Sequence, residues 1–304
     1  MKRLYPLFVF LIALVAVIWF AQRLHDKRYI TEEEEIIEEP AETMEEIKTD
    51  SIPGDFRAWV SLTPAESKRL IAKGLLLYGP FADQLNDGDL IVCRGTTNHY
   101  IAEELLGGKM EPGRFTNGRI APANSPFNTA ETDQITELYF HNGLYTNLSF
   151  DEALDKLRRG SVILKGANLI NYDTKKAAVL VVNSDDGTMG KILPHIGDRG
   201  ARLIIPVGLE KNSSSDIDAL VKKMNDPAQG IPRLLLLPGE LFTEIEAIKQ
   251  FAYVDVTQIA SGGVGGAEGA VSLVIRGTQD NVEEAMRNIK KIQGEKAFFS
   301  RDSI

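Results

Sequence analysis

The sequence predicts an α/β protein whose mostly parallel sheet is covered by helices. Beyond residue 51, short apolar runs alternate with helix-like segments, which is the pattern of such folds. The apolar runs are nearly continuous, as is typical of parallel strands that are buried on both faces. Two further segments complete the prediction. An N-terminal transmembrane helix precedes the sheet, and a C-terminal β-loop-β-α unit follows it.

The first element is an apolar run at residues 4–21 that holds eighteen residues and no charge. Its length is at the short end of what a membrane-spanning helix needs. A cleaved signal peptide is the alternative, but the run ends without the small residues that precede a cleavage site. Trp19 lies where an interfacial anchor would lie. We therefore predict an uncleaved transmembrane anchor at residues 1–22.

The sequence leaves open on which side of the membrane the body lies. Two basic residues precede the apolar run, and Arg23, Lys27 and Arg28 follow it, so the charges that set orientation nearly cancel. The single cysteine, Cys93, excludes an intramolecular disulfide and does not identify the compartment.

An acidic stalk is predicted at residues 23–58. Its segment 31–50 holds nine Glu, one Asp and one Lys, and such a block repels itself and stays solvated. A docking site for a basic partner is the alternative. The whole chain has a net charge of −9, so the body is nearly balanced, and it shows no basic stripe with interleaved aromatic residues. Nucleic acid is therefore not expected as a ligand.

The body is predicted to comprise a domain at residues 59–250. Thr63 and Glu66 form a capping box that begins a helix, and Ser149 and Glu152 begin another. An irregular excursion lies between residues 107 and 147, with a hairpin at Asn142. The predicted strands are nearly continuous apolar runs, and they occupy residues 90–93, 162–165, 178–182, 203–207 and 234–237.

The pattern changes in residues 251–304, where two segments alternate with period two. Residues 254–259 and 270–275 read as strands, and Asp280 then caps an amphipathic helix that runs to about Ile292. The unit is either a small separate layer or the antiparallel edge of the main sheet.

Polar, glycine-containing loops follow the predicted strands. In α/β sheets, ligands bind beyond the carboxyl ends of strands. The segment VCRGTTNHYIAEELLG passes from a strand through glycine into a helix, and the free N–H groups at such a helix start suit an anion. Alternatively, Thr96, Thr97 or Asn98 only caps the helix. Charged residues at other strand ends favour a small-molecule site, namely Lys165, Asp185, Asp186, Glu210 and Lys211.

Several motifs carry a resemblance. RGTTN at Arg94, KGAN at Lys165 and GTMG at Gly187 resemble the phosphate and carbonyl loops of a superfamily. It groups ribose-5-phosphate isomerase, glucosamine-6-phosphate deaminase, the sensor domain of DeoR-type repressors and CoA transferases. The likeness covers roughly residues 60–250 and implies a Rossmann-like sheet. Together with RLIAKGLL, ARLIIPVGLEK and SGGVGGAEGAV, these motifs also resemble a conserved bacterial family of unassigned activity.

One departure from the superfamily bears on catalysis. Its isomerases carry a proton-transferring carboxylate in the loop that matches Gly166 to Asn168, and Asn168 cannot act as a general base near neutral pH. We therefore predict Lys165 and Glu210 as the catalytic residues. The predicted ligand-binding residues lie in the loops after the strands, and they are Gly95, Thr96, Thr97, Asn98, Gly166, Asn168, Asp186, Gly187, Thr188, Lys211 and Glu268.

Three further features of the sequence bear on its chemistry. His99 follows the anion loop and could donate to a phosphate, or it is simply a residue of the first helical turn. The four histidines and Cys93 lack ligand-like spacing, so no metal site is predicted. The glycine-rich segment 262–269, with Glu268, is either a phosphate-binding backbone or a flexible hairpin loop.

The sequence therefore predicts a membrane-anchored protein that binds a small anionic metabolite, such as a phosphorylated sugar, a nucleotide or a CoA ester. It is either an isomerase or transferase, or else a non-catalytic sensor or a scaffold with a degenerate site. The expected partners are this metabolite and, through the N-terminal helix, the membrane. The sequence identifies no cofactor, and it allows an oligomer without specifying one.

Overall fold

A computed structural model describes residues 52–111, 113–117, 120, 135–182, 186–197, 199–225 and 232–297. The chain divides into two units, Met1–Asp50 and Ser51–Ile304. The predicted anchor and nearly all of the predicted stalk lie outside the described residues. Within the described ranges, no helix combines the length and the apolar character needed to cross a bilayer.

The centre of the Ser51–Ile304 unit is a mixed sheet of six strands, which confirms the α/β class. Its order is β10 (Glu240–Phe242), β8 (Arg202–Pro206), β5 (Val162–Leu164), β2 (Asp89–Val92), β3 (Leu138–His141) and β4 (Leu144–Thr146). The first four strands are mutually parallel, and β3 and β4 are antiparallel. The predicted strands at 90–93, 162–165 and 203–207 belong to this sheet, whereas β10 was not predicted.

Two predicted strands lie in a different sheet. β7 (Lys176–Val181) pairs with β6 (Leu169–Asn171) and with β9 (Arg233–Leu236), all antiparallel. The prediction that residues 178–182 and 234–237 belong to the parallel sheet is therefore wrong. The apolar run of β7 arises because this strand is buried on both faces. Ala177 and Val179 lie in the main core, and Ala178 lies in a smaller core under α7 (Ile217–Met224).

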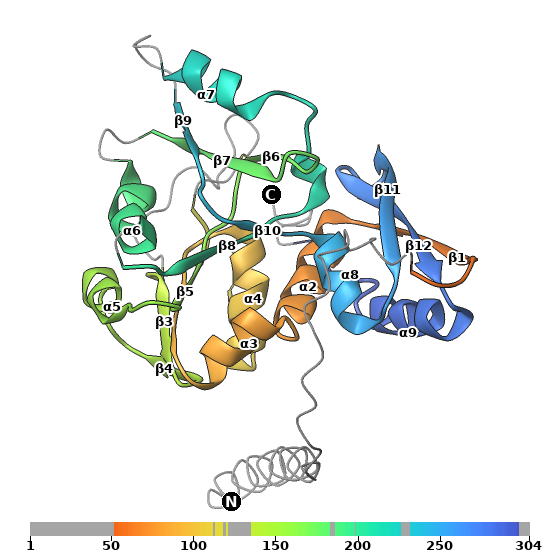
Figure 1. The fold of residues 1–304 in the computed structure, drawn as a ribbon, viewed down its shortest axis with the longest axis horizontal. Coiled ribbons are helices and arrows are strands. Elements are labelled where there is room, and N and C mark those ends of the chain that lie inside the picture. The colour runs from red at the N-terminus through yellow and green to blue at the C-terminus, as the bar shows by residue number, and fades with distance from the viewer. Residues whose placement is uncertain are drawn as a thin grey trace, which may run out of the picture. The chain divides into compact units, whose positions relative to one another are not determined.

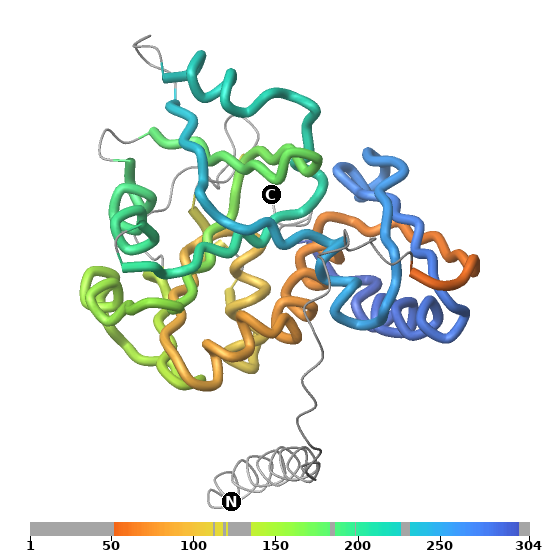
Figure 2. The backbone as a smooth tube through the Cα atoms, in the orientation of Figure 1, coloured from red at the N-terminus to blue at the C-terminus, as the bar shows by residue number. Residues whose placement is uncertain are grey.

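The C-terminal unit contains the predicted strands and helix, β11 (Asp255–Gly262), β12 (Ala270–Gly277) and α9 (Gln279–Lys290). It forms a third sheet in the order β1-β12-β11 and is not an edge of the main sheet. Its third strand, β1 (Phe56–Leu62), begins inside the segment that was predicted as stalk and pairs with β12 along its whole length. Figure 2 shows this early segment beside the blue C-terminal segments.

Helices surround the central sheet, and three of them begin with a capping box. These three are α2 (Pro64–Leu75), α5 (Phe150–Lys156) and α8 (Glu244–Phe251). The helix starts predicted at Thr63 and Ser149 are thus confirmed. The remaining segments are α3 (Gly79–Asn86), α4 (Thr96–Leu106), α6 (Gly187–Gly197) and the 3₁₀ turn η2 (Leu209–Lys211). In Figure 1, the β6-β7-β9 sheet lies above the central sheet and the β1-β12-β11 sheet lies to its right.

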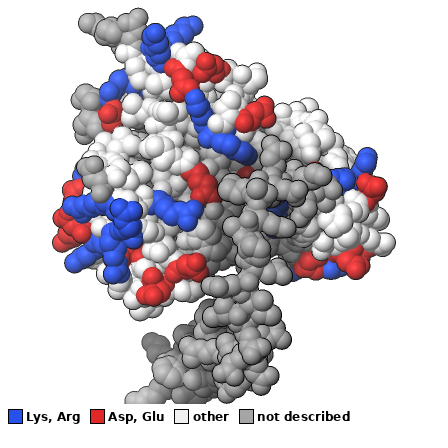
Figure 3. Space-filling model, viewed as in Figure 1, with Lys and Arg blue, Asp and Glu red and all other residues white. Residues whose placement is uncertain are grey.

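One hydrophobic core joins the central sheet to the C-terminal unit. Val92, Ile163 and Ile204 belong to the same cluster of buried side chains as Leu273 and Ile275 of β12. The C-terminal unit is therefore packed into the body rather than appended to it. On the face drawn in Figure 3, basic and acidic side chains are interspersed, in keeping with the nearly balanced charge of the body.

Candidate functional site

The parallel strands β2, β5, β8 and β10 end at the same edge of the central sheet, because each is in register with its neighbour. The residues that follow them are where an α/β fold binds ligands. Five charged residues lie at or near this edge, and we call them the strand-end cluster. They are Lys68 of α2, Lys165 after β5, Glu210 and Lys211 of η2, and Glu244 at the first position of α8.

Glu210, predicted as catalytic, points one carboxylate oxygen at Lys68. The Lys68 Nζ lies 3.6 Å from Glu210 Oε1, and it also donates to the carbonyl oxygen of Pro64 at 3.1 Å. The second oxygen, Oε2, is buried and has no hydrogen-bond partner within the described part of the chain. Gly208 makes room for it, since a Cβ there would lie 1.8 Å from this oxygen. The local glycine thus allows the carboxylate to fold inward.

Glu244 is fully buried at the start of α8. Its Oε2 accepts a hydrogen bond from the backbone N–H of Leu209 at 2.9 Å, and its Oε1 has no partner among the described residues. Burial and the nearby negative charge of Glu210 raise the pKa of Glu244 to about 7. A carboxyl group with such a pKa can hold or release a proton at neutral pH.

Lys211, predicted to bind ligand, donates from Nζ to the carbonyl oxygen of Ala167 at 2.7 Å. Burial lowers the pKa of Lys211, and the positive charges of Lys68 and Lys165 lower it further, while Glu210 and Glu244 act in the opposite direction. Glu210 forms its ion pair with Lys68. Across the described ranges, Lys211 has no carboxylate at ion-pair distance.

The loop after β2 begins α4 without a side-chain cap. Gly95 is the N-cap residue, and no side chain accepts from the first N–H groups of the helix. The alternative that Thr96, Thr97 or Asn98 caps this helix is therefore wrong. A Cβ on Gly95 would meet only Asn98 Cβ at 3.9 Å, so the start of α4 is not crowded. The geometry that suits an anion is present.

Two predicted ligand-binding amides serve the fold instead. Asn98 is fully buried, and its Nδ2 donates to the carbonyl oxygens of Cys93 and Leu164, which tie the ends of β2 and β5 together. Asn168 Oδ1 accepts from the backbone N–H of Leu180 at 3.0 Å and holds β7. Neither amide was distinguishable from a ligand-binding group in the sequence, because both follow predicted strands.

The structure does not bring Asp186, Gly187 and Thr188 to the strand-end cluster by any described contact. They follow β7, which belongs to the separate antiparallel sheet, and begin α6. Asp186 forms an ion pair with Arg233 of β9 at 2.6 Å. They were predicted as site residues on the assumption that the strand before them joins the parallel sheet.

The glycine-rich segment 262–269 is the loop of the β11–β12 hairpin, and its end lies beside the cluster. Gly269 has a φ of +81°, and a Cβ there would lie 3.3 Å from Pro64 Cγ and 4.0 Å from Glu210 Cβ. Glu268 turns back on the loop, where its Oε2 accepts from the backbone N–H of Gly266 at 2.9 Å. The segment therefore forms a hairpin loop, and its last glycine permits a close approach to Glu210.

Sequence reasoning missed Lys68 and Glu244. Lys68 lies inside a helix that was predicted, but no periodicity shows which of its faces meets a strand end. Glu244 had a usable signal, since Thr243 and Glu246 have capping-box spacing directly after the apolar pair Leu241 and Phe242. That pattern marks a strand that ends at a helix start.

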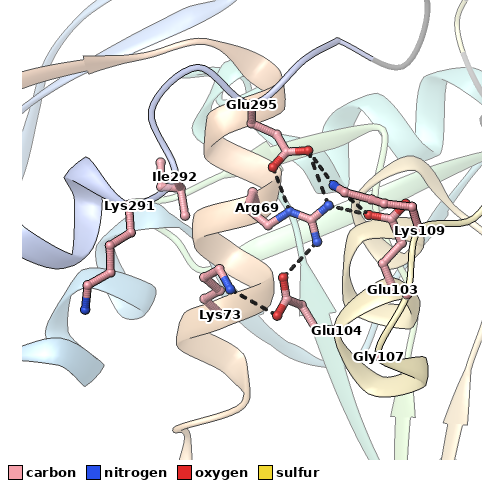
Figure 4. A pocket seen from close by; sticks show the side chains of 10 residues that line it. Arg69, Lys73, Glu103, Glu104, Gly107, Lys109, Lys291, Ile292 and Glu295 are labelled. Atoms are coloured by element: carbon pink, nitrogen blue, oxygen red, sulfur yellow. Dashed lines mark hydrogen bonds and ion pairs between the residues drawn. The ribbon is translucent and has the colours of Figure 1, made fainter. Parts of the chain in front are cut away.

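A second charged group, the Arg69 cluster, lines a surface pocket of about 400 Å³ between α2, α4 and the segment after α9 (Figure 4). Arg69 is buried and pairs with Glu103, with Glu104 at 2.8 Å and with Glu295 at 3.0 Å. Lys109 reaches Glu295 at 2.8 Å. We define the cluster as these five residues, in which the central cation and the carboxylates are mutually paired.

His99 faces the Arg69 cluster, where its Nε2 lies 3.4 Å from Glu103 Oε1. Burial lowers the pKa of His99, which opposes the effect of Glu103. Its side chain therefore points along α4 towards a group of paired charges. Of the two alternatives for His99, donation to a phosphate stays a hypothesis.

Comparison with protein-family models, curated proteins and solved structures found no match to this chain. Within the described ranges, no group of three or more His, Cys, Asp or Glu side chains is placed to hold a metal ion. The chemistry of the strand-end cluster therefore has to be argued from its own residues.

Proposed function

We propose that the Ser51–Ile304 unit is a Rossmann-like domain, of the type found in sugar-phosphate isomerases and CoA transferases, that binds a small anionic metabolite. The ligand is a phosphorylated sugar, a nucleotide or a CoA ester. It lies at the carboxyl ends of β2, β5, β8 and β10. The observation that carries the proposal is the meeting of Lys165 and Lys211 at the edge where α4 begins without a side-chain cap.

Charge balance supports an anionic ligand. Glu210 is paired with Lys68, and the raised pKa of Glu244 keeps much of that group neutral near pH 7. Lys165 then has no carboxylate at ion-pair distance within the described ranges. A phosphate or carboxylate that accepts from the N–H groups of α4 would be the missing counter-charge.

We further propose that the domain is an enzyme. Lys165 and Glu210 lie near the reacting carbons, and the enzyme is an isomerase or a transferase. Glu244 favours this version over a non-catalytic sensor or a scaffold with a degenerate site, because a buried carboxyl group with an unpartnered oxygen and a pKa near 7 suits proton transfer.

The binding test uses ribose 5-phosphate, AMP, coenzyme A and inorganic phosphate as probes of the full chain, first by thermal shift and then by calorimetric titration. For the probe that binds, Thr96→Ala, Thr97→Ala and Lys165→Ala should each weaken affinity by about ten- to a hundredfold, the range of one charge-assisted hydrogen bond. Lys222→Ala, in α7, is the matched control. Unchanged affinity in all three variants would overturn the proposed site.

The membrane anchor at residues 4–21 and the acidic stalk remain part of the proposal. The length and composition of the apolar run support them. Intact-mass analysis of protein purified from the membrane fraction should show the full N-terminus. A mature chain that begins near Gln22 would mean that the run is a signal peptide.

A further inference from the structure

The partners of Lys211 differ from those of Lys68, another lysine of the strand-end cluster. The Lys68 Nζ lies 3.6 Å from Glu210 Oε1, so this lysine has a carboxylate partner. The Lys211 amine donates to a neutral carbonyl oxygen, and inside the described part of the chain it has no carboxylate at ion-pair distance. An ammonium group in such surroundings is costly, so the neutral amine is favoured.

Lys211 also lies at the ligand-binding edge of the sheet. Lys211 keeps a partly exposed surface, and it follows β8 at the strand edge where small molecules bind in this kind of sheet. The neutral form of a lysine is a nucleophile, and it reacts with aldehydes and ketones. The neighbouring carboxyl groups of Glu210 and Glu244 each have a buried oxygen without a described partner, and the raised pKa of Glu244, about 7, lets that group take or give a proton.

We propose that Lys211 is a covalent catalytic residue that forms a Schiff base with a small anionic carbonyl compound. This inference rests on the proposed function, since the anionic group of the substrate would occupy the site at the start of α4. It goes further by making the ligand an aldehyde or ketone and by naming the nucleophile.

The step balances with the groups of the cluster. The lone pair of Nζ attacks the carbonyl carbon, the C=O π electrons move to oxygen, and a proton from Glu244 gives a carbinolamine. The C–O bond then breaks with a further proton transfer, so one water leaves and a C=N bond forms. The Nζ ends as a protonated imine, and the carboxylate that is left stabilises its positive charge. No oxidant or reductant is needed.

Trapping by a hydride donor tests the assignment. The full chain is incubated near pH 7 with limiting pyridoxal 5′-phosphate or glyoxylate and sodium cyanoborohydride, which reduces the imine to a stable secondary amine. Intact mass gives the number of adducts, and peptide mapping gives their position. We expect one adduct, on Lys211, because each unit by which a lysine pKa falls raises its neutral fraction about tenfold.

Two variants separate a specific reaction from general lysine modification. Lys211→Arg keeps a long basic side chain but removes the nucleophilic amine, and it should slow adduct formation by at least about tenfold. Lys222→Arg removes a lysine of α7 and should leave the rate unchanged. Peptide mapping of the wild type needs no variant, so the test holds even if Lys211→Arg does not fold. Propanal, a neutral aldehyde, should react more slowly than glyoxylate.

Adducts spread over many lysines, or a single adduct on Lys165, would overturn the proposal, and equal rates for propanal and glyoxylate would overturn an anionic substrate. The outcome is distinct from that of the binding test. If phosphate compounds bind through Thr96 and Lys165 but Lys211 is not trapped, this inference fails and the anion site stands. If Lys211 is trapped but those variants bind normally, the anion site is elsewhere.

Discussion

Lys68 and Arg69 are neighbours on α2, yet they belong to two charged clusters of opposite character. Arg69 is surrounded by the carboxylates of Glu103, Glu104 and Glu295. Lys68 belongs to the strand-end cluster, in which Glu210 and Glu244 each have an oxygen without a described partner. Consecutive helical residues point about 100° apart, so one helix serves both groups. The first cluster consists of charges that are paired with one another, and the second contains the charges that we propose to be placed for a ligand.

Energetics supports this distinction. Paired buried charges are expensive to break, because removal of one partner leaves the other uncompensated. Unpaired buried polar groups lower the stability of the fold. They are therefore found mainly at functional sites, where they act on a bound molecule. Four predictions test the comparison, from the largest expected effect to the smallest.

Replacement of Arg69 by Met should cost roughly 3–5 kcal/mol of unfolding free energy, because Glu103 would be left as a buried charge without its main partner. Urea denaturation followed by circular dichroism measures the loss. Arg287→Met is the matched control, since Arg287 is an exposed residue of α9 that pairs with Glu284 on the same helix. Its cost should stay below about 1 kcal/mol. A similar small cost for Arg69 would remove its structural role.

Glu244 should make stability depend on pH in the direction opposite to an ordinary paired carboxylate. Its folded pKa of about 7 exceeds the unfolded value of 4.5, so the folded state binds the proton more tightly. The unfolding free energy should therefore fall by up to roughly 3 kcal/mol as pH rises from 4.5 to above 7.

The matched measurement for Glu244 compares urea unfolding of the wild type and of Glu244→Gln at several pH values. The amide stands in for the protonated carboxyl group and does not titrate. The stability difference between the two proteins should thus move in favour of the variant at high pH. A difference that is constant with pH would show that folding leaves the pKa of Glu244 unchanged.

Lys211→Met should change the unfolding free energy by only about 1 kcal/mol in either direction, because an apolar side chain replaces an amine whose burial is already costly. The same variant should lose the adduct trapped on wild-type Lys211. This pairing of a small stability effect with a complete functional loss is the reverse of that expected for Arg69. A loss above about 3 kcal/mol would assign Lys211 to the fold.

The smallest effect is expected at the start of α4. Thr96→Ala should change stability by less than about 0.5 kcal/mol, since no side chain caps that helix. Thr63→Ala, at the capped start of α2, should cost about 0.5–2 kcal/mol. Equal losses in thermal or urea unfolding would mean that Thr96 has a capping contact after all.

Local signals in the sequence predict much of this fold. Capping boxes at Thr63 and Ser149 locate helix starts because they satisfy backbone groups within four residues. Apolar runs locate β2, β5 and β8, and thereby Lys165, Glu210 and Lys211 at strand ends. The pairing of strands depends on contacts far apart in sequence. For this reason β7 and β9 were assigned to the wrong sheet.

The site was predicted less completely than the fold. A polar residue after a strand gives the same sequence signal whether it binds a ligand or a neighbouring backbone group. Asn98 and Asn168 bind backbone groups. Lys68 and Glu244 come from helices whose positions are set by tertiary packing. Burial of the Glu244 carboxyl group, which shifts its pKa, cannot be read from the residues around it in sequence.

The pairing of β1 with β12 has a consequence for how the chain is made. Phe56 of β1 pairs with Gly277, so the first strand has to wait for almost the whole chain to leave the ribosome. Until then the strand is unpaired, with Phe56 and Trp59 among the side chains that stay exposed even in the folded protein. Such a segment can pair with other chains during synthesis. The last step of folding should therefore be the docking of β1, and translation speed should affect the yield of folded protein.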